Sequence, residues 1–368
     1  MMRSSSILWR LLWPVRVATT PLYAVGLKAH QGLYDVGIKR RHRPPVPVIC
    51  VGNLSTGGTG KTPIVISIVR MLQAAGRTVG VLTRGYKGKG KQAAKDATME
   101  SPAQMRVSPR DVGDEPFLMI EKLAGAHILV GSDRAASARI AVEQFGCNVL
   151  VMDDGFQHWA LARDLDLVVV DAGQPRALNH LMPWGNLREG FGALGRAQVA
   201  IITKAWDPRQ RERTAELVRR ANPSIAVWHV DFVPREIRRL ADGAVIGRDA
   251  LDGEPVILVC GLASPDGFEQ TARQLGCQIA ARFFYPDHFT YPDLVIRYLE
   301  IQAKKLDARC FLTTEKDAVK LRGRISPTAP WAAVAIEPVW LDPPEEHVRA
   351  FVSGAQDSKG GRQNVGMG

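Results

Sequence analysis

Short apolar runs alternate with amphipathic segments through residues 47–205. The runs have the length and composition of buried strands, and the segments 62–75 and 133–145 between them carry apolar residues at helical spacing. Strands that alternate with helices form a parallel sheet covered by helices on both faces, so we expect an α/β fold of this kind. The six runs are 46–53, 78–85, 126–131, 148–154, 166–172 and 199–205.

A second α/β pattern follows in the last third of the chain. It predicts a strand, a loop and a helix over 254–276, a strand and a loop over 278–289, and a strand, a loop and a helix over 308–321. The segments 228–240 and 331–341 flank this block and could pair as a two-stranded connector that serves as a hinge. We therefore expect a smaller second α/β domain joined to the first by this connector.

These patterns divide the chain of 368 residues into four parts. The polar stretch 87–110 lacks periodicity and is expected to form a mobile loop or hairpin beside the functional site. The composition of the last residues is typical of disorder. The parts are an N-terminal segment 1–45, a core 46–227, a smaller C-terminal α/β domain with the connector strands 228–345, and a helix end with a disordered tail 346–368.

The N-terminal segment is basic and partly apolar. Residues 1–50 hold eight basic side chains against one acidic side chain, and such an end can bind nucleic acid, anionic lipid or an acidic substrate. The apolar run 7–27 is a poor membrane span, because two arginines interrupt it and Pro14 and Pro21 should break its helix. It is also a poor signal peptide, because charge breaks the run and no cleavage site is clear.

Aromatic and basic residues share this segment at helical spacing. Trp9, Leu12 and Trp13 recur beside Arg10 and Arg16. The pattern is typical of a helix that lies in the membrane interface, with tryptophans at the headgroup level and arginines against lipid phosphates. The alternative is a helix packed on the protein's own core.

The cysteines form no CxxC pair, and most lie in or beside apolar runs. This favours buried, reduced thiols and a cytosolic protein without structural disulfides or a thiolate metal site. They are Cys50, Cys147, Cys260, Cys277 and Cys310.

A glycine-rich stretch, VGNLSTGGTGKTP, joins a predicted strand to a predicted helix. It matches the phosphate-binding pattern G-x-x-x-x-G-K-[ST] at Gly60, Lys61 and Thr62, with Ser55 in place of the first glycine. Backbone N–H groups of such a loop, and the N-terminus of the helix, bind phosphate oxygens. Lys61 would contact the β and γ phosphates, and Thr62 would bind Mg²⁺. The predicted nucleotide-binding residues are Ser55, Thr56, Gly57, Gly58, Thr59, Gly60, Lys61 and Thr62.

Acidic side chains end two of the predicted strands. Asp153 and Asp154 follow an apolar run, and adjacent carboxylates at a strand end need a nearby cation. Mg²⁺ on the nucleotide phosphates would be that cation. Asp171 is a weaker candidate, and its alternative role is to cap the next turn.

The stretch TKAWD resembles the TKxD pattern by which GTPases read guanine, but Trp206 stands where the aspartate is needed. We therefore expect ATP rather than GTP. Lys204 could still lay its stem against the base.

Two more polar clusters carry candidate chemistry. Asp114 and Glu115 precede a helical run with Pro116 in its first turn. They either cap that helix or serve as a general base and a metal ligand. Asp287 and His288 lie in a loop rich in tyrosine and proline, where a lone histidine is commonly structural or exposed.

Together these motifs resemble the tetraacyldisaccharide 4'-kinase family, the lipid A 4'-kinases of Gram-negative bacteria. The resemblance covers about residues 45–345, and the combination and order of the motifs are far more specific than the phosphate loop alone. The motifs are VGNLSTGGTGKTP, LTRGYKGKG, VGDEP, DDGFQH, LMPWGNLREG, GLASPDGF, YPDHF and TTEKDAVKL.

The resemblance implies ATP-dependent phosphorylation of the 4' hydroxyl of a tetraacylated glucosamine disaccharide 1-phosphate, with Mg²⁺ as cofactor. It implies a P-loop NTPase-type sheet with a smaller second α/β domain. It also implies a peripheral protein at the cytoplasmic face of the bacterial inner membrane. Neither nucleic acid nor an obligatory protein partner is expected.

The resemblance also assigns roles to residues. Asp114 matches the family's catalytic aspartate and His288 its histidine partner, while Glu115, Asp153 and Asp154 match acidic residues around Mg²⁺. The candidates on the phosphate and substrate side are Arg84, Tyr86, Gln157, His158 and Lys204.

Two other classes of protein use similar loops. Membrane-bound nucleotide switches carry an extra lysine early in the loop, where this chain has Thr56. GTPases that deliver metals or cofactors need the displaced aspartate of TKAWD and clusters of Cys or His ligands, which this sequence does not offer.

Overall fold

The structure is a computed structural model that describes residues 13–85, 95–98, 108–173, 180–204, 207–342, 344 and 348. The predictions that lie outside these residues concern Trp9, Arg10, Leu12, Tyr86, most of the loop 87–110 and nearly all of the tail 346–368.

The described strands form one mixed sheet of 13 strands. They are β1 (Val48–Asn53), β2 (Val79–Thr83), β3 (Lys95–Thr98), β4 (His127–Val130), β5 (Val149–Asp153), β6 (Leu165–Asp171), β7 (Val199–Thr203), β8 (Ala226–Arg239), β9 (Val245–Ile246), β10 (Pro255–Gly261), β11 (Gln278–Tyr285), β12 (Cys310–Thr314) and β13 (Trp331–Trp340). Their order is β11-β10-β12-β13-β8-β7-β6-β1-β5-β2-β4-β3, with β9 paired to β8.

Nine α-helices accompany the sheet in the described part of the chain. They are α2 (Trp13–Asp35), α3 (Lys61–Ala74), α4 (Pro109–Val112), α5 (Asp114–Lys122), α6 (Arg134–Glu143), α7 (Pro208–Ala221), α8 (Asp266–Gln274), α9 (Asp293–Lys305) and α10 (Glu315–Leu321). The six strands and two helices predicted for residues 47–205 are all present as β1, β2, β4, β5, β6, β7, α3 and α6.

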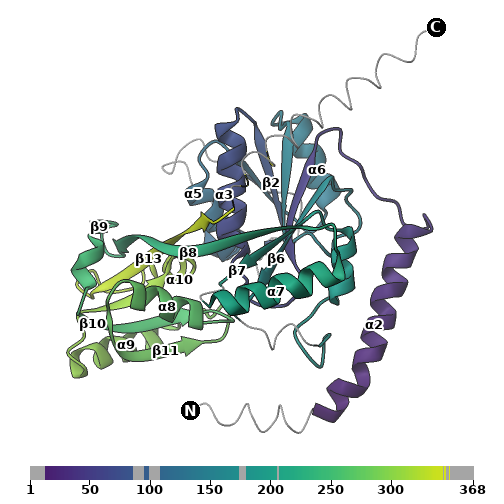
Figure 1. The fold of residues 1–368 in the computed structure, drawn as a ribbon. Coiled ribbons are helices and arrows are strands. Elements are labelled where there is room, and N and C mark those ends of the chain that lie inside the picture. The colour runs from purple at the N-terminus through teal and green to yellow at the C-terminus, as the bar shows by residue number, and fades with distance from the viewer. Residues whose placement is uncertain are drawn as a thin grey trace.

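The half of the sheet from β1 to β7 is covered on both faces, as predicted (Figure 1). Successive residues of a strand point to opposite faces. Ile49 and Val51 accordingly belong to the apolar cluster that includes residues of α3 and α5, and Val48 and Cys50 to the cluster that includes residues of α6 and α7. Only the edge strand β3 runs antiparallel to its neighbour in this half.

The C-terminal half repeats this arrangement on a smaller scale. Its parallel strands β10, β11 and β12 are covered by α9 and α10 on one face and by α8 on the other. The predicted connector is present, because β8 and β13 pair in an antiparallel manner from Arg239 and Ala332 to Val230 and Trp340. Since β8 also pairs with β7 and β13 with β12, the connector joins both halves into one sheet.

The sheet places the phosphate loop at a switch point. β1 lies between β5 and β6, and the chain leaves its carboxyl end through the loop to α3. Open α/β sheets bind ligands at the carboxyl ends of the strands at such points. Asp153 and Asp171 end the two neighbouring strands, so the topology brings these carboxylates to the same edge.

The expectation that Pro21 breaks the N-terminal helix is wrong. Pro21 lies inside α2, which continues to Asp35. Proline removes only one backbone hydrogen bond, and Thr20 just before it donates its hydroxyl to the Arg16 carbonyl at 2.8 Å. None of the residues of α2 is buried, and the helix stands at the side of the molecule (Figure 1).

Two elements of the C-terminal half differ from the sequence pattern. No loop separates β12 from α10, because Thr314 ends the strand and caps the helix by accepting a hydrogen bond from the Asp317 N–H at 3.2 Å. The helix α9 was not predicted. Among its residues only Ile296, Leu299 and Ala303 are buried, so its apolar stripe is narrow.

Candidate active site

The phosphate loop ends in a helix whose N-terminus is open to a ligand. Gly60 precedes α3 with φ of 87°, a left-handed conformation that favours glycine. A Cβ atom at Gly60 would also come within 2.6 Å of the Phe232 ring. No side chain caps α3, so its first N–H groups remain available to an anion.

The rest of the loop is held by hydrogen bonds. The Asn53 amide donates to the Ser55 carbonyl at 2.7 Å and to the Thr59 hydroxyl at 3.2 Å. The Thr56 N–H donates to the Asn186 carbonyl at 2.7 Å, so it already has a partner within the protein. The N–H groups that remain as phosphate donors therefore lie toward the glycines and the start of α3.

Lys204 links the phosphate loop to the end of β6. Its ammonium group donates to the Gly58 carbonyl and pairs with Asp171 at 2.8 Å. Asp171 also accepts a hydrogen bond from the Gly173 N–H at 2.9 Å, which is the turn-capping role that the sequence left open. Asp207 of TKAWD caps α7 by accepting from the Arg209 N–H at 2.9 Å.

A cavity of about 200 Å³ lies between the phosphate loop and the C-terminal half. Its polar lining includes the phosphate loop with Lys61, Thr62 and Glu115. Its apolar walls are Leu118, Phe232, Leu262, Phe268, Val334 and Ile336, which come from both halves of the sheet and from the connector. The lining therefore combines groups that can bind phosphates with apolar side chains that can contact a flat apolar group.

The two aspartates after β5 have different surroundings. Asp154 is partly exposed and pairs with Lys61 at 3.3 Å and with Arg188 at 3.0 Å. Burial would raise the pKa of Asp154, but the Lys61 and Arg188 cations hold that pKa below its ordinary value. Asp153 is buried and accepts a hydrogen bond from the Thr83 hydroxyl at 3.0 Å.

The surroundings of Asp153 disfavour its charged form, although Lys61 and the hydrogen bond from Thr83 act in the opposite direction. Burial, together with the nearby carboxylates of Glu115 and Asp154, raises the pKa of Asp153 to about 7. A divalent cation beside these carboxylates would offset both effects. Within the described residues, no three acidic, histidine or cysteine side chains form a complete metal cage. The carboxylates of Glu115, Asp153 and Asp154 suit Mg²⁺, which commonly takes one or two carboxylates plus substrate phosphates.

Asp114 and His288 meet across the two halves of the sheet. His288 Nδ1 lies 3.2 Å from Asp114 Oδ2, although the residues are 174 positions apart. Asp114 is the first residue of α5, and its side chain does not cap that helix. His288 has φ of 60°, and such left-handed conformations of non-glycine residues cluster at functional sites.

Two lysines of α10 reach the same acidic pair. Lys320 lies 3.3 Å from Asp114, and Lys316 lies 2.9 Å from Glu115 and 3.0 Å from Asp287. Burial would raise the pKa of Asp114, but the hydrogen bond from His288 and the Lys320 charge lower it below its ordinary value. Sequence reasoning gave these lysines no role, although both lie in the motif TTEKDAVKL.

Other predicted residues lie around the site in supporting positions. Gln157 donates to the Asn53 carbonyl at 3.0 Å and to Glu189 at 2.9 Å. Burial and the cations Arg134 and Arg163 lower the pKa of His158 to about 4, so this histidine is neutral at pH 7. Arg84 is exposed at the end of β2. Arg188, on the motif LMPWGNLREG, was missed because its partner Asp154 is distant in sequence.

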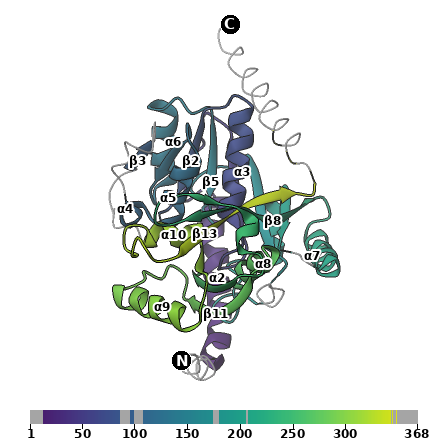
Figure 2. The ribbon, with the colours of Figure 1, turned by 90° about the vertical axis from the view of Figure 1, so that its left-hand side faces the viewer.

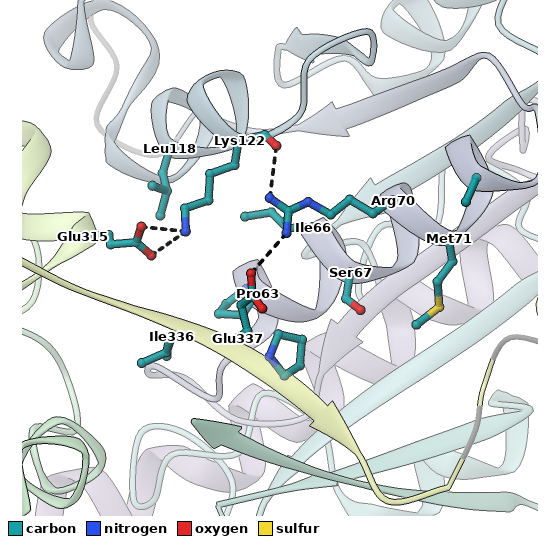
Figure 3. Close-up of a pocket in the computed structure, with 12 residues that line it drawn as sticks. Pro63, Ile66, Ser67, Arg70, Met71, Leu118, Lys122, Glu315, Ile336 and Glu337 are labelled. Carbon is teal, nitrogen blue, oxygen red and sulfur yellow. Dashed lines mark hydrogen bonds and ion pairs between the residues drawn. The ribbon is translucent and has the colours of Figure 1, made fainter. Parts of the chain in front are cut away.

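A second cavity, of about 330 Å³, lies beside α3 and the end of α5 (Figure 3). Lys122 and Glu315 point toward each other at its edge with 2.6 Å between charged atoms. Arg70 of α3 lies 3.6 Å from Glu337 of β13. The charged side chains that line this second cavity are thus already paired with one another.

Known proteins match most of this chain. The family model described as Tetraacyldisaccharide-1-P 4'-kinase matches residues 8–353. A tetraacyldisaccharide 4'-kinase from Anaeromyxobacter sp. (strain Fw109-5) is 38% identical over 318 residues, which is 84% of this chain and 83% of that protein. Another from Syntrophus aciditrophicus (strain SB) is 36% identical over 310 residues, which is 81% of this chain and 82% of that protein.

A solved structure extends the agreement to the fold. The crystal structure described as the "apo" form of LpxK from Aquifex aeolicus in complex with ATP matches with a TM-score of 0.70 and 26% identity. The match covers 95% of this chain and 99% of that chain. The resemblance found in the sequence is therefore confirmed, and the chain belongs to the tetraacyldisaccharide 4'-kinase family, the ATP-dependent kinases of lipid A biosynthesis.

Proposed function

We propose that this chain performs the family's reaction with Asp114 as the general base and His288 as the residue that orients it. The contact between Asp114 Oδ2 and His288 Nδ1 at 3.2 Å carries this proposal. A sugar hydroxyl is a weak nucleophile, so a carboxylate should accept its proton as the oxygen attacks. The 4' oxygen bonds to the γ-phosphorus, the bond to the β-phosphate oxygen breaks, and the proton passes to Asp114 as ADP leaves.

The phosphates of ATP would bind at the N-terminus of α3. Lys61 is largely buried, lines the cavity and would neutralise charge on the β and γ phosphates. The base would contact the apolar side chains of the cavity, such as Phe268 and Leu262. The crystallised relative was solved in complex with ATP, which supports ATP as the nucleotide.

We assign Mg²⁺ to Thr62, Glu115 and Asp153, with Asp154 nearby. When bound, the ion would neutralise charge on the transferred phosphoryl group. Asp153 is the strongest candidate, because its buried charge lacks an ion-pair partner among the described residues, whereas Asp154 and Glu115 have one each or more. The share of each carboxylate is a prediction.

Closure of the C-terminal half would complete the site. Residues 46–227 supply the phosphate loop and Asp114, and residues 228–345 supply His288. The β8–β13 connector lies between them and would serve as the hinge. A site that forms only on closure would limit hydrolysis of ATP in the absence of lipid.

A labelling assay tests the proposed reaction. Protein is mixed with Mg²⁺, ATP labelled in the γ-phosphate and a tetraacylated disaccharide 1-phosphate in detergent. We expect label in the lipid when all components are present, and little inorganic phosphate when lipid is omitted. Rapid release of inorganic phosphate at the same rate with and without lipid would contradict closure as the trigger.

Asp153→Asn should stabilise the protein in the absence of Mg²⁺ and nucleotide. The pKa of Asp153 is about 7 in the folded state, against about 3.9 for an unperturbed aspartate. The folded state thus holds a proton that the unfolded state has lost, so stability falls as pH rises from about 4 to 7. We expect the Tm of the variant to exceed that of the wild type by about 2 °C or more at pH 8. The difference should shrink toward pH 5.

A kinase assay on the same variant distinguishes the loss of a metal ligand from a substitution that the protein merely tolerates. Asp153→Asn should also lose most kinase activity, because a ligand for Mg²⁺ is gone. If the variant is less stable than the wild type at pH 8, or stays fully active, the assignment of Asp153 as a metal ligand is contradicted.

We also propose that α2 binds the surface of the membrane, at the cytoplasmic face of the inner membrane. No helix among the described residues is long and apolar enough to cross a bilayer. On α2, however, Trp13, Leu22 and Val25 are 55%, 73% and 66% exposed. One side of the helix touches the protein, where Arg16 donates to the Pro183 carbonyl at 2.6 Å, and the apolar side chains remain for lipid.

The basic residues divide into two groups. Arg16 is tied to Pro183, and Arg41 pairs with Asp35 at 2.6 Å. Exposed Lys28 and Arg40 are therefore better candidates for contact with lipid phosphates.

Replacing Trp13, Leu22 and Val25 by serine should weaken binding to vesicles that contain phosphatidylglycerol and raise the apparent KM for lipid. ATP binding and the Tm should barely change, because these side chains are exposed. Val245→Ser on β9 removes an apolar side chain that is 60% exposed elsewhere and serves as the control. A fall in Tm with unchanged vesicle binding would instead support a helix that packs on the core.

A further inference from the structure

A series of ion pairs joins α5, in the N-terminal half of the molecule, to α10 and the residue after it, in the C-terminal half. Figure 2 shows α10 beside α5. At the C-terminal end of α5, Arg322 lies 2.5 Å from Glu121, and Lys122 lies 2.6 Å from Glu315. At the N-terminal end of α5, Lys320 pairs with Asp114, the proposed catalytic base. Lys316 pairs with Glu115, a proposed metal ligand.

We infer that Lys320 is a positioning residue that fixes the orientation of the Asp114 carboxylate. Lys320 Nζ lies 3.3 Å from Asp114 Oδ2, the same oxygen that faces His288 Nδ1 at 3.2 Å. Among the described residues, Lys320 Nζ contacts Oδ2 as an ion pair and makes no hydrogen bond, whereas His288 lies at hydrogen-bond distance from it. With both groups on Oδ2, we expect the other oxygen, Oδ1, to accept the proton of the incoming hydroxyl. This inference rests on the proposed role of Asp114 as the base.

Lys320 is itself held by a buried carboxylate. Asp317 is fully buried and lies 2.9 Å from Lys320. It also accepts hydrogen bonds from the Gly261 N–H at 3.0 Å and the Thr314 hydroxyl at 2.9 Å. Because Asp317 is anchored to the ends of two strands, β10 and β12, the lysine it holds has little freedom.

The surroundings of Lys320 separate it from an ordinary surface ion pair. Its side chain is only 9% exposed, and the ammonium group lies 5.6 Å from the centre of the buried Tyr291 ring. Arg322 is 42% exposed, and exposed pairs contribute little to stability. Lys320 is thus a buried cation placed between two carboxylates by ion pairs and packing, and such fixed placement is what a positioning role requires.

The inference predicts a specific kinetic defect. Without Lys320, Asp114 would keep only His288 and could rotate away from the hydroxyl. A displacement of about 1 Å in a reacting group can cost about 100-fold in rate, so we expect Lys320→Met to lower kcat by about 10- to 100-fold. The KM for ATP should stay within about threefold, because Lys320 is not among the residues that line the nucleotide cavity.

The experiment compares Lys320→Met with Arg322→Met and combines it with Asp114→Asn. Arg322→Met also removes one cation from the α5–α10 interface, but its partner Glu121 is outside the site, so kcat should be near that of the wild type. If Lys320 acts through Asp114, the double variant Asp114→Asn/Lys320→Met should be no slower than Asp114→Asn alone. A purely structural loss would add to the effect of Asp114→Asn.

Asp317→Asn keeps the shape of the anchor and removes its charge. It should reproduce part of the loss in kcat, and it keeps the inference testable if Lys320→Met does not fold. A kcat for Lys320→Met within threefold of that for Arg322→Met, or effects that multiply in the double variant, would overturn the inference while leaving Asp114 as the base. A nearly normal kcat for Asp114→Asn would instead overturn the proposed base, and the inference with it.

Discussion

Lys61→Ala is expected to lower kcat by about 100- to 1000-fold, or about 2.7–4 kcal/mol, which is typical for the loss of one preorganised charge at a transition state. Lys61 is the first residue of α3, is 13% exposed and lines the proposed nucleotide cavity. Its partner Asp154 would keep Arg188 at 3.0 Å, so the fold should survive. Steady-state kinetics with ATP and the lipid acceptor measure the effect.

Arg70→Met is the control for Lys61→Ala. Arg70 is on the same helix and 48% exposed, but it faces the second cavity (Figure 3). Its loss should leave kcat and ATP binding close to those of the wild type. Unchanged turnover in Lys61→Ala would contradict the assignment of this loop to the phosphates.

Asp114→Asn should lower kcat by about 100- to 10,000-fold, the range for a general base. The substitution keeps the size of the side chain and its contact with His288, but it cannot accept the proton of the hydroxyl. ATP affinity should stay within a few fold, and His288→Ala should give a milder loss of the same kind. Loss of ATP binding with turnover intact at saturation would show that Asp114 binds the nucleotide.

The sequence predicted the elements of the fold because each is encoded locally. The apolar runs around Val149 and Val168 are short and every residue of both strands is buried. The phosphate loop was recognisable because Gly60, Lys61 and Thr62 follow one another in the chain. Pro21 shows the limit of such rules, because an exposed helix tolerates one missing hydrogen bond.

The contacts within the site could not be predicted in the same way. Lys316 and Lys320 look like the solvent-exposed lysines of any amphipathic helix, and only the docking of α10 on α5 brings them to Glu115 and Asp114. Arg188 reaches Asp154 from a loop 34 residues away. The resemblance to a known family named Asp114 and His288 as partners, but local spacing could not bring together residues 174 positions apart.

The central claim is that Asp114 and His288 act as one unit across the two halves of the molecule. A double-mutant cycle of kcat under single-turnover conditions, with Asp114→Asn, His288→Ala and both changes together, tests it most directly. The account predicts that the double variant is about as slow as Asp114→Asn alone, because His288 has no other catalytic task. Losses that multiply, so that the double variant is slower by the full effect of His288→Ala, would contradict it.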